Sequence, residues 1–378
     1  MTRFASLPGL LCLATALAGC GDAPPAGPPP LSDKALAAVG PEPGAPRRAV
    51  ARTIEDLFAA DGAGETRALV LMHEGSIVAE RYADGYDADT RFVSWSMAKT
   101  VTAMLIGLLV SDGLLQLDEP APVARWRRPG DPRSTITLRH LLQMRSGLEH
   151  VEAGPVPGES SEVQMLFLGG RDDMARWAEE QPLEAEPGER FEYSSNTTVI
   201  LADIAARALT DSADPDTRRR AVLGYLETRL LEPLGVTSLV PEFDAKGTMI
   251  GGSLMHATAR DWARIGDLLR TRGSYRGTQI LPRRWVARMV ESSPTAPHYG
   301  FQTWLNRPLD DNTGDSEHPL FPDRAPETLF AMIGHMGQYA LMSPQQRVTL
   351  VRLGHSDAPE RAVLLPRMAN LLELYPAR

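Results

Sequence analysis

The sequence contains only two cysteines among its 378 residues, and both of them, Cys12 and Cys20, lie within the first twenty positions. A disulfide framework and a cysteine-based metal site are therefore excluded from the folded body. Lysine is nearly as scarce, because Lys34, Lys99 and Lys246 are the only three among 39 basic residues. Arginine stays protonated in proteins whereas a lysine amine can lose its proton, so each lysine is a candidate for proton transfer.

Several common functional signatures are also missing. The sequence has no Gly-x-Ser-x-Gly elbow, no phosphate-binding or dinucleotide-binding glycine loop and no His-Glu-x-x-His metal motif. Its eight histidines are dispersed, so we expect no metal site and no metal or organic cofactor. The formal net charge is −9 and the basic residues are scattered. This balance argues against a nucleic-acid partner and against binding to an anionic membrane by charge.

The N-terminal segment has the pattern of an export signal. A short apolar run follows Arg3 and ends in Leu17-Ala18-Gly19-Cys20, which resembles the lipobox of bacterial lipoproteins. The resemblance implies removal of residues 1–19 and attachment of lipid to Cys20, and hence a periplasm-facing lipoprotein of the bacterial cell envelope that touches the membrane only through this anchor. An ordinary secretory signal with an incidental cysteine is the alternative. Residues 20–48 are rich in proline and are predicted to form an extended linker.

Residues 49–378 are predicted to form one α/β (α+β) domain. Two lobes are expected, a sheet lobe from residues 49–92 and 236–378 and a mainly helical lobe from residues 93–235. The helical patterns fall at 53–60, 96–110, 198–209 and 361–374 and after the capping sequence at 258–261, and the strand patterns fall at 67–72, 76–82, 299–305, 328–333, 338–342 and 348–353. Because the strands come from both ends of the chain, a mainly antiparallel sheet flanked by helices is expected.

Ser96-Met97-Ala98-Lys99 stands at the start of a helix that is apolar nearly all round. The spacing of three places the Ser96 hydroxyl and the Lys99 amine on one helical face. A hydroxyl nucleophile needs a nearby base, and burial in an apolar helix lowers the pKa of a lysine amine toward the neutral form that can serve. The structural alternative is that Ser96 caps the helix while the Lys99 side chain reaches out to solvent.

Five motifs in register resemble the serine β-lactamase-related superfamily. They are residues 92–100 (FVSWSMAKT), 136–142 with 146–148 (ITLRHLL, SGL), 191–195 (FEYSS), 251–253 (GGS) and 334–337 (GHMG). Within this superfamily the chain most resembles the class C β-lactamase-like esterases and the aminohexanoate-dimer hydrolases. The resemblance implies a β-lactamase/transpeptidase-like fold and a serine hydrolase that works through an acyl-enzyme without a cofactor.

The resemblance also implies roles for individual residues. Ser96 becomes the nucleophile, and Lys99 and Tyr193 share a proton as its base, in an order that the sequence leaves open. The backbone N–H groups of Ser96 and Gln338 become the oxyanion hole. Ser195, His335, Gly337, Trp95 and Trp304 become substrate-binding residues, although the two tryptophans are equally consistent with ordinary core packing.

Two departures from the lactamase pattern affect the expected substrate. His335-Met336-Gly337 replaces Lys-Thr-Gly, which removes a cation suited to a substrate carboxylate. Tyr193-Ser194-Ser195 replaces Tyr-x-Asn, and Asn196 comes one place late. We therefore expect hydrolysis of a small ester or amide. The alternatives are a true β-lactamase or D-alanyl-D-alanine carboxypeptidase, and a catalytically inactive envelope binding or scaffold lipoprotein.

Overall fold

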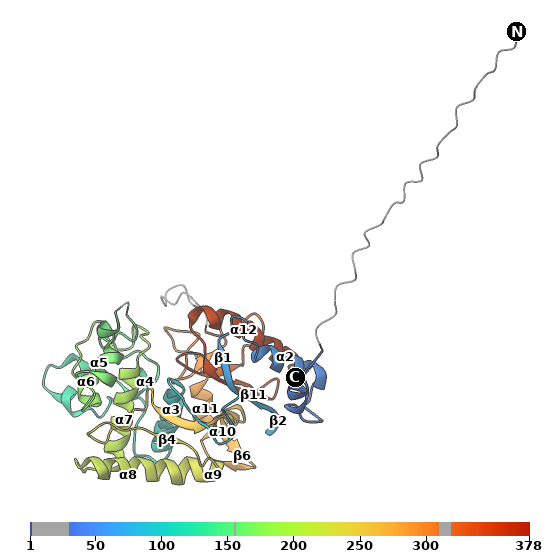
Figure 1. Ribbon diagram of the computed structural model, residues 1–378. Coiled ribbons are helices and arrows are strands. Elements are labelled where there is room, and N and C mark those ends of the chain that lie inside the picture. The colour runs from blue at the N-terminus through green and yellow to red at the C-terminus, as the bar shows by residue number, and fades with distance from the viewer. Residues whose placement is uncertain (2–29, 155, 310–318) are drawn as a thin grey trace.

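The computed structural model describes residue 1 and residues 30–154, 156–309 and 319–378 (Figure 1). The candidate signal segment and Cys20 lie outside these residues. In the described part, no helix combines the length and the apolar character that crossing a membrane requires.

A six-stranded sheet forms the centre of one lobe, and all its ladders are antiparallel. Its order is β2-β1-β11-β10-β9-β8, so strands from the two ends of the chain pair at its middle, as predicted. The strands are β1 (Glu65–His73), β2 (Ser76–Tyr82), β8 (Trp304–Leu305), β9 (Phe330–Gly334), β10 (Gln338–Ser343) and β11 (Val348–His355). A three-stranded sheet has the order β3 (Arg91–Val93), β5 (Met255–Thr258) and β4 (Val240–Pro241). A two-stranded sheet consists of β6 (Ser274–Tyr275) and β7 (Thr278–Gln279).

Helices cover both faces of the large sheet. Because side chains alternate along each strand, neighbouring residues point into two separate cores. Leu69 and Leu71 of β1 belong to a core shared with helices α1 (Asp33–Ala37), α2 (Arg47–Leu57) and α12 (Ala358–Glu373). Val70 points to the other core, which α3 (Met97–Ser111) and α10 (Ala259–Arg270) complete. The arrangement explains why β1 and β11 carry almost unbroken apolar runs.

The helical lobe lies on the other side of α3 (Figure 1). Its longest element, α7 (Ser195–Leu209), packs against α3, α4, α6 and α8. The remaining helices are α4 (Leu138–Leu142), α5 (Ser161–Phe167), α6 (Met174–Glu179), α8 (Pro215–Leu226), α9 (Glu232–Leu234) and α11 (Arg283–Met289). The contact between α3 and α7 matters for function, because it brings the Ser96 and Tyr193 motifs together.

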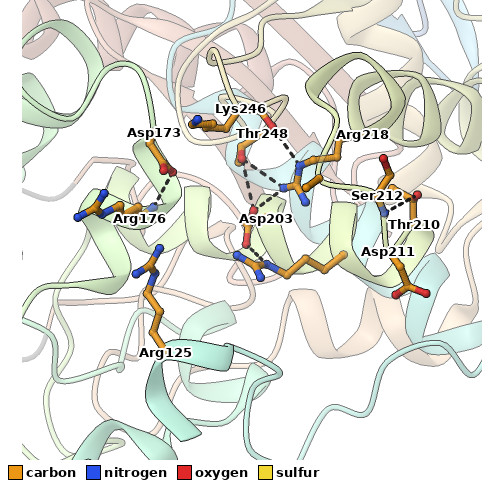
Figure 2. Close-up of a pocket in the computed structure, with 12 residues that line it drawn as sticks. Arg125, Asp173, Arg176, Asp203, Thr210, Asp211, Ser212, Arg218, Lys246 and Thr248 are labelled. Atoms are coloured by element: carbon orange, nitrogen blue, oxygen red, sulfur yellow. Dashed lines mark hydrogen bonds and ion pairs between the residues drawn. The ribbon is translucent and has the colours of Figure 1, made fainter. Parts of the chain in front are cut away.

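A polar hollow of about 380 Å³ in this lobe is built from ion pairs (Figure 2). The carboxylate of Asp203, which is 2% exposed, accepts hydrogen bonds from Arg207 and Arg218. Arg218 also donates to the carbonyl of Lys246 over 3.1 Å. These contacts tie α7 and α8 to the loop at residue 246, so the ion pairs give the hollow a structural explanation.

The structure corrects three sequence predictions. The described part of the predicted linker is packed rather than extended, since Ala35 is fully buried and the Tyr375 hydroxyl donates to the carbonyl of Pro43. The helix expected at 53–60 begins earlier, at Arg47. Of the strand expected at 299–305 only Trp304–Leu305 is extended, because the chain turns at Gln302, whose φ is 53°.

Candidate active site

Ser96 and Lys99 occupy the first turn of α3, as the motif predicted. The Lys99 amine lies 2.9 Å from the Ser96 hydroxyl, and the Lys99 side chain is 1% exposed. The Ser96 hydroxyl makes no capping hydrogen bond at the helix start. The structural alternative, a capping serine beside a solvent-directed lysine, is therefore wrong, and the pair has the geometry of a nucleophile and its base.

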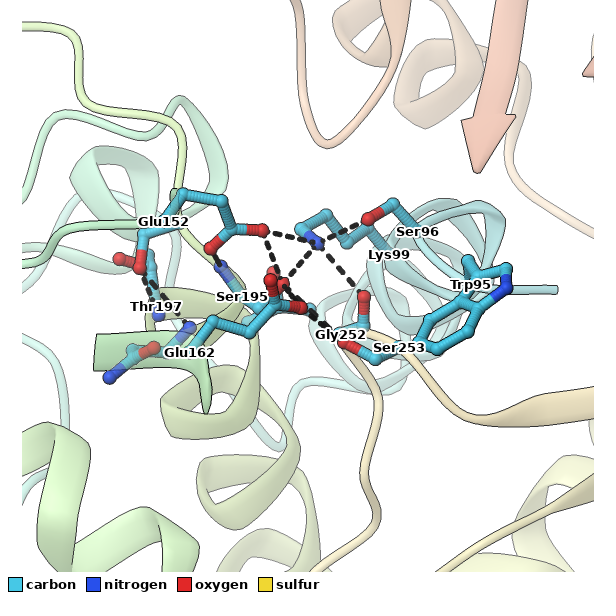
Figure 3. A network of polar contacts seen from close by, with 12 residues as sticks. Trp95, Ser96, Lys99, Glu152, Glu162, Ser195, Thr197, Gly252 and Ser253 are labelled. Carbon is cyan, nitrogen blue, oxygen red and sulfur yellow. Dashed lines mark hydrogen bonds and ion pairs between the residues drawn. The ribbon is translucent and has the colours of Figure 1, made fainter. Parts of the chain in front are cut away.

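The Lys99 amine has three hydrogen-bond acceptors around it (Figure 3). Besides Ser96, the Ser195 hydroxyl lies at 2.7 Å and the Gly252 carbonyl at 2.8 Å. Gly252 can approach because it lacks a side chain, since a Cβ there would stand 2.8 Å from the backbone oxygen of Ser195. The Gly251-Gly252-Ser253 motif thus has a steric reason.

Burial dominates the electrostatics of the lysine. Removal from water lowers the pKa of Lys99, and the charges of Glu152 and Glu162 partly oppose this shift. The amine consequently becomes neutral at a lower pH than that of a free lysine. A neutral amine keeps one lone pair, which is the acceptor that the Ser96 proton needs.

Tyr193 reaches the same site from the segment before α7. The Lys99 amine stands 4.7 Å above the centre of its ring, and the ring packs at 5.2 Å from that of Trp304. Burial and the charge of Glu152 raise the pKa of Tyr193 well above its usual value, although a hydrogen bond with the Ser96 side chain acts in the opposite direction. These effects favour the neutral phenol of Tyr193 over its anion.

Two carboxyl groups that the sequence analysis missed complete the network. Glu152 and Glu162 both reach the Ser195 hydroxyl, at 2.6 Å and 2.8 Å, and Glu152 lies 3.7 Å from the Lys99 amine. Burial, followed by the charge of Glu162, raises the pKa of Glu152 to about 7 against the opposing effect of Lys99. Their only sequence signal is position, since both follow the Ser146-Gly147-Leu148 motif in a stretch without regular periodicity.

Ser195 itself is placed differently from its predicted role. It is fully buried beneath the nucleophile and does not line the cavity described below, so it holds Lys99 rather than a substrate. Asn196 does not replace the missing asparagine of the lactamase pattern. Its amide donates to the carbonyl of Ser161 at 3.4 Å, and its own oxygen is buried without a partner among the described residues.

A cavity of about 680 Å³ opens at Ser96. Its apolar wall includes both tryptophans named from the sequence, Trp95 and Trp304, so they do face the cavity. The titratable residues Glu152, Glu162, Tyr193, His335 and Arg361 also line the cavity. Trp95 has a φ of 46° and meets the His335 ring edge-on at 5.3 Å, so the residue before the nucleophile has an uncommon backbone conformation.

The turn after β9 forms the opposite rim of the cavity. His335 lines it, and partial burial lowers the pKa of this histidine, which favours the neutral ring at pH 7. Gly337 instead sits in the turn with a φ of 77°, and a Cβ there would meet Arg352 at 2.9 Å. Gly337 was predicted to bind substrate, but it does not line the cavity and its open side faces Arg352.

The predicted second oxyanion donor also lies elsewhere. Gln338 is 3% exposed, pairs with Gly334 across the β9–β10 ladder and does not line the cavity. The backbone N–H groups of Ser96 and His335 do belong to cavity-lining residues, and in the described part of the chain neither donates to another backbone carbonyl. Two free amides at the nucleophile are what a developing oxyanion requires.

Fold and site together define a hydrolase with the β-lactamase/transpeptidase architecture. The Beta-lactamase family model matches residues 50–373, so the chain belongs to this family. The 6-aminohexanoate-dimer hydrolase of Paenarthrobacter ureafaciens is 24% identical over 229 residues, which are 58% of this chain and 56% of that protein. The chain thus matches little more than half the length of this curated relative.

Solved structures show the same fold at low identity. A candidate 6-aminohexanoate-dimer hydrolase from Bacillus anthracis superimposes with a TM-score of 0.64 at 22% identity, covering 85% of this chain and 83% of that one. A penicillin-binding protein homologue from Caulobacter crescentus gives a TM-score of 0.56 at 18% identity, covering 89% and 97%. A D-stereospecific amidohydrolase from Streptomyces sp. gives 0.55 at 18%, covering 83% and 98%.

Proposed function

We propose that the protein hydrolyses small esters or amides through an acyl-enzyme on Ser96. The observation that carries this proposal is the 2.9 Å contact between the Ser96 hydroxyl and a buried lysine amine, at the mouth of a cavity with two free backbone amides. Hydrolase activity agrees with the family, whereas the acyl-enzyme and the substrate class are proposals.

The first half-reaction forms the acyl-enzyme. The Ser96 oxygen attacks the substrate carbonyl carbon while its proton passes to the neutral amine of Lys99. The carbonyl oxygen takes the negative charge and is held by the N–H groups of Ser96 and His335. As the tetrahedral centre collapses, the leaving atom receives the proton of the Lys99 ammonium, with the Tyr193 phenol as carrier.

The second half-reaction releases the acyl group. Water attacks the carbonyl carbon of the acyl group on Ser96. Its proton passes to the Lys99 amine, either directly or through the Tyr193 phenol. The Ser96 oxygen then takes its proton back when the acyl carbon leaves as a carboxylic acid. A phenol with a raised pKa suits this role, because it passes a proton on without remaining ionised.

Labelling by a fluorophosphonate probe tests the nucleophile. Native protein should be labelled at Ser96, and both the Ser96→Ala variant and heat-denatured protein should remain unlabelled. Hydrolysis of a series of p-nitrophenyl esters by the wild type and by Ser96→Ala then measures the acyl preference. A folded wild type that neither takes the label nor cleaves any ester would instead support an inactive binding or scaffold protein.

Turnover of nitrocefin tests the second candidate, a β-lactamase or D-alanyl-D-alanine carboxypeptidase. The fold is shared with such enzymes, but His335 and Met336 stand where lactamases have lysine and threonine. The neutral ring of His335 provides no cation for the lactam carboxylate. We expect ester cleavage without efficient nitrocefin turnover.

We also propose that the protein is an exported lipoprotein of the cell envelope, anchored through Cys20. The support is the signal pattern of residues 1–19 and the absence of any other cysteine after residue 12. Metabolic labelling with a fatty acid in a bacterial host is expected to mark the wild type and not Cys20→Ala. Labelling of neither protein, with normal export, would favour an ordinary secretory signal.

A further inference from the structure

The Ser195 hydroxyl has more hydrogen-bonding neighbours than a hydroxyl between two ionised acids can satisfy. Glu152 Oε1 lies at 2.6 Å from it, Glu162 Oε1 at 2.8 Å, and the Lys99 amine at 2.7 Å (Figure 3). A hydroxyl has one proton to donate and two lone pairs to accept with. If both carboxyls were ionised, one of them would face the Ser195 oxygen without a proton between them.

One additional proton satisfies every group. If one carboxyl is protonated, it donates to the Ser195 oxygen, which accepts a second hydrogen bond from Lys99 and donates its own proton to the other carboxylate. Each of these contacts is then a normal hydrogen bond. Two carboxylates beside the same atom also repel each other, which favours the singly protonated state.

The remaining contacts hold the acid pair in place. Glu152 accepts a hydrogen bond from the backbone N–H of Ser195 at 2.6 Å, and Glu162 accepts one from the Ser253 hydroxyl at 3.0 Å. The Glu152 side chain is only 19% exposed. Both residues come from the segment between α4 and α6, so the helical lobe supplies the acids and α3 supplies the lysine.

We propose that Glu152 and Glu162 act as a proton-sharing acid pair, bridged by the Ser195 hydroxyl, that serves as the counter-ion of Lys99 in the acylation reaction. They are positioning residues, since they act through Lys99. This inference rests on the proposed function and deepens it.

The proton count follows from the contacts of the lysine. Before acylation, a neutral Lys99 amine donates to Gly252 and Ser195 and turns its lone pair to the Ser96 hydroxyl. When the Ser96 oxygen bonds to the acyl carbon, its O–H bond breaks and a third N–H bond forms on Lys99. The positive charge that results lies 3.7 Å from Glu152, where the single negative charge of the pair compensates it. Neither carboxyl gains or loses a proton in this step.

Other titratable groups face the pair from the neighbouring elements. They are Lys99 on α3, Tyr193 before α7, Tyr299 in the loop before β8 and His335 after β9. Burial raises the pKa of both tyrosines and lowers that of His335, so these three groups stay neutral near pH 7. The pH dependence of the rate near neutrality therefore reports Lys99 and the two acids as one coupled unit.

The test is the pH profile of kcat/KM for an uncharged ester, p-nitrophenyl acetate. As pH rises, the wild-type site can lose its first proton either from the Lys99 ammonium or from the acid pair. In Glu162→Gln or Glu152→Gln the remaining acid is already ionised, so only the Lys99 ammonium can lose a proton, and it does so beside one negative charge. The acid limb of the profile, in which kcat/KM rises with pH, should therefore move to higher pH in both single variants. The double variant removes both charges, so its limb should lie at lower pH than that of either single variant. Glu159→Gln, at an exposed position on the same segment, is the matched control and should keep the wild-type limb.

Infrared difference spectra give a readout that does not depend on turnover. At neutral pH the spectrum of the wild type minus that of either single variant should show the C=O stretch of a protonated carboxyl, because the acid left in the variant ionises beside Lys99. Other protonated carboxyls, such as that of Glu179, are common to both proteins and cancel. Absence of this band from the difference spectrum, or single variants with slower rates but an unmoved limb, would overturn the proposal. So would variants that change only KM for amine-bearing esters, which would make the pair a subsite for a substrate ammonium. Absence of Ser96-dependent turnover in the wild type would remove the proposed function and leave the infrared result to judge the acid pair.

Discussion

The Lys99 amine and the Ser195 hydroxyl lie 2.7 Å apart although 96 residues separate them in the chain. The contact joins the first turn of α3 to the first residue of α7. The contact fixes the direction of the Lys99 side chain. A lysine has a flexible four-carbon stem, and the hydrogen bond to Ser195 holds its amine at the Ser96 hydroxyl. The packing of α3 on α7 is therefore what turns two separate motifs into one site.

Removal of the Ser195 hydroxyl should weaken catalysis without unfolding the protein. Ser195→Ala leaves the Lys99 amine and both acids without their shared partner, which costs about 1–3 kcal/mol for a buried polar group. We expect kcat/KM for p-nitrophenyl acetate to fall about tenfold to a hundredfold. Thr197→Val is the control, because this hydroxyl contacts His150 at 3.3 Å and does not contact Lys99. Equal losses in the two variants would contradict the role given to Ser195.

Replacement of Lys99 should show whether its neutral amine is the base. Lys99→Met keeps much of the buried side-chain volume and removes the acceptor, so kcat/KM should fall by about 10²–10⁴. Lys99→Arg should be as inactive, since a guanidinium keeps its proton. Circular dichroism spectra would verify folding. Substantial activity in the folded arginine variant would transfer the role of base to another group.

Gly334 is a point where β9 touches the segment that carries the nucleophile. A Cβ at this position would stand 2.2 Å from the backbone oxygen of Ser94, so Gly334→Ala must push β9 and Ser94 apart. Small displacements of reacting groups cost about 10²-fold in rate, and we expect a loss of that size in kcat/KM. Gly224→Ala in α8 meets no atom within 4 Å and should instead stabilise the protein by about 0.5–1 kcal/mol. Thermal melts and kinetics of both variants measure the contrast.

Acid pH should stabilise the fold through a second buried carboxyl, Glu179. Its side chain is 1% exposed, one of its oxygens has no partner in the described part of the chain, and burial raises its pKa to about 7. The unfolded state ionises near the ordinary value of 4.5. The folded state thus binds more protons between these values, and its stability falls as pH rises from 4.5 to 7. Each pH unit in this window is worth about 1.4 kcal/mol at most.

Glu179→Gln should flatten this dependence, because an amide does not titrate. The measurement is Tm at intervals of pH from 4.5 to 7.5 for the wild type and the variant. Glu159→Gln, at an exposed position, should reproduce the wild-type slope. If the wild-type Tm rose over this range, carboxylates with lowered pKa would outweigh Glu179.

The parts of the site that could be predicted from sequence are those held by local geometry. Ser96 and Lys99 share one turn of a helix, so a spacing of three was sufficient to pair them. The strands also carried their own apolar pattern. Tyr193 needed the family resemblance, since nothing in its neighbourhood indicates that it meets Ser96.

The other parts depend on tertiary contacts that no local pattern encodes. Glu152 lies in a loop and Glu162 in the first turn of the short helix α5, and the two acids meet Ser195 only because α5 packs on α7. The assignment of Gln338 failed because a three-residue turn separates β9 from β10, which places His335 rather than Gln338 at the cavity. Gly337 serves that turn and not the substrate.

Arg361 gives the last prediction, which concerns substrate charge. It lines the cavity from α12, and its guanidinium donates a long hydrogen bond of 3.5 Å to the carbonyl of Ser356. No carboxylate of the described part forms an ion pair with it, whereas many other arginines there have one. A guanidinium in this position is suited to a substrate carboxylate.

We therefore expect Arg361→Met to raise KM for aryl esters of a dicarboxylic acid while leaving KM for the matching uncharged ester unchanged. The methionine retains apolar packing against the cavity wall, so the comparison isolates the charge. Arg367→Met, on the same helix but bonded to the carbonyl of Asp56, should leave both values alone. An equal change in KM for the charged and the neutral ester would mean that Arg361 shapes the cavity without selecting for charge.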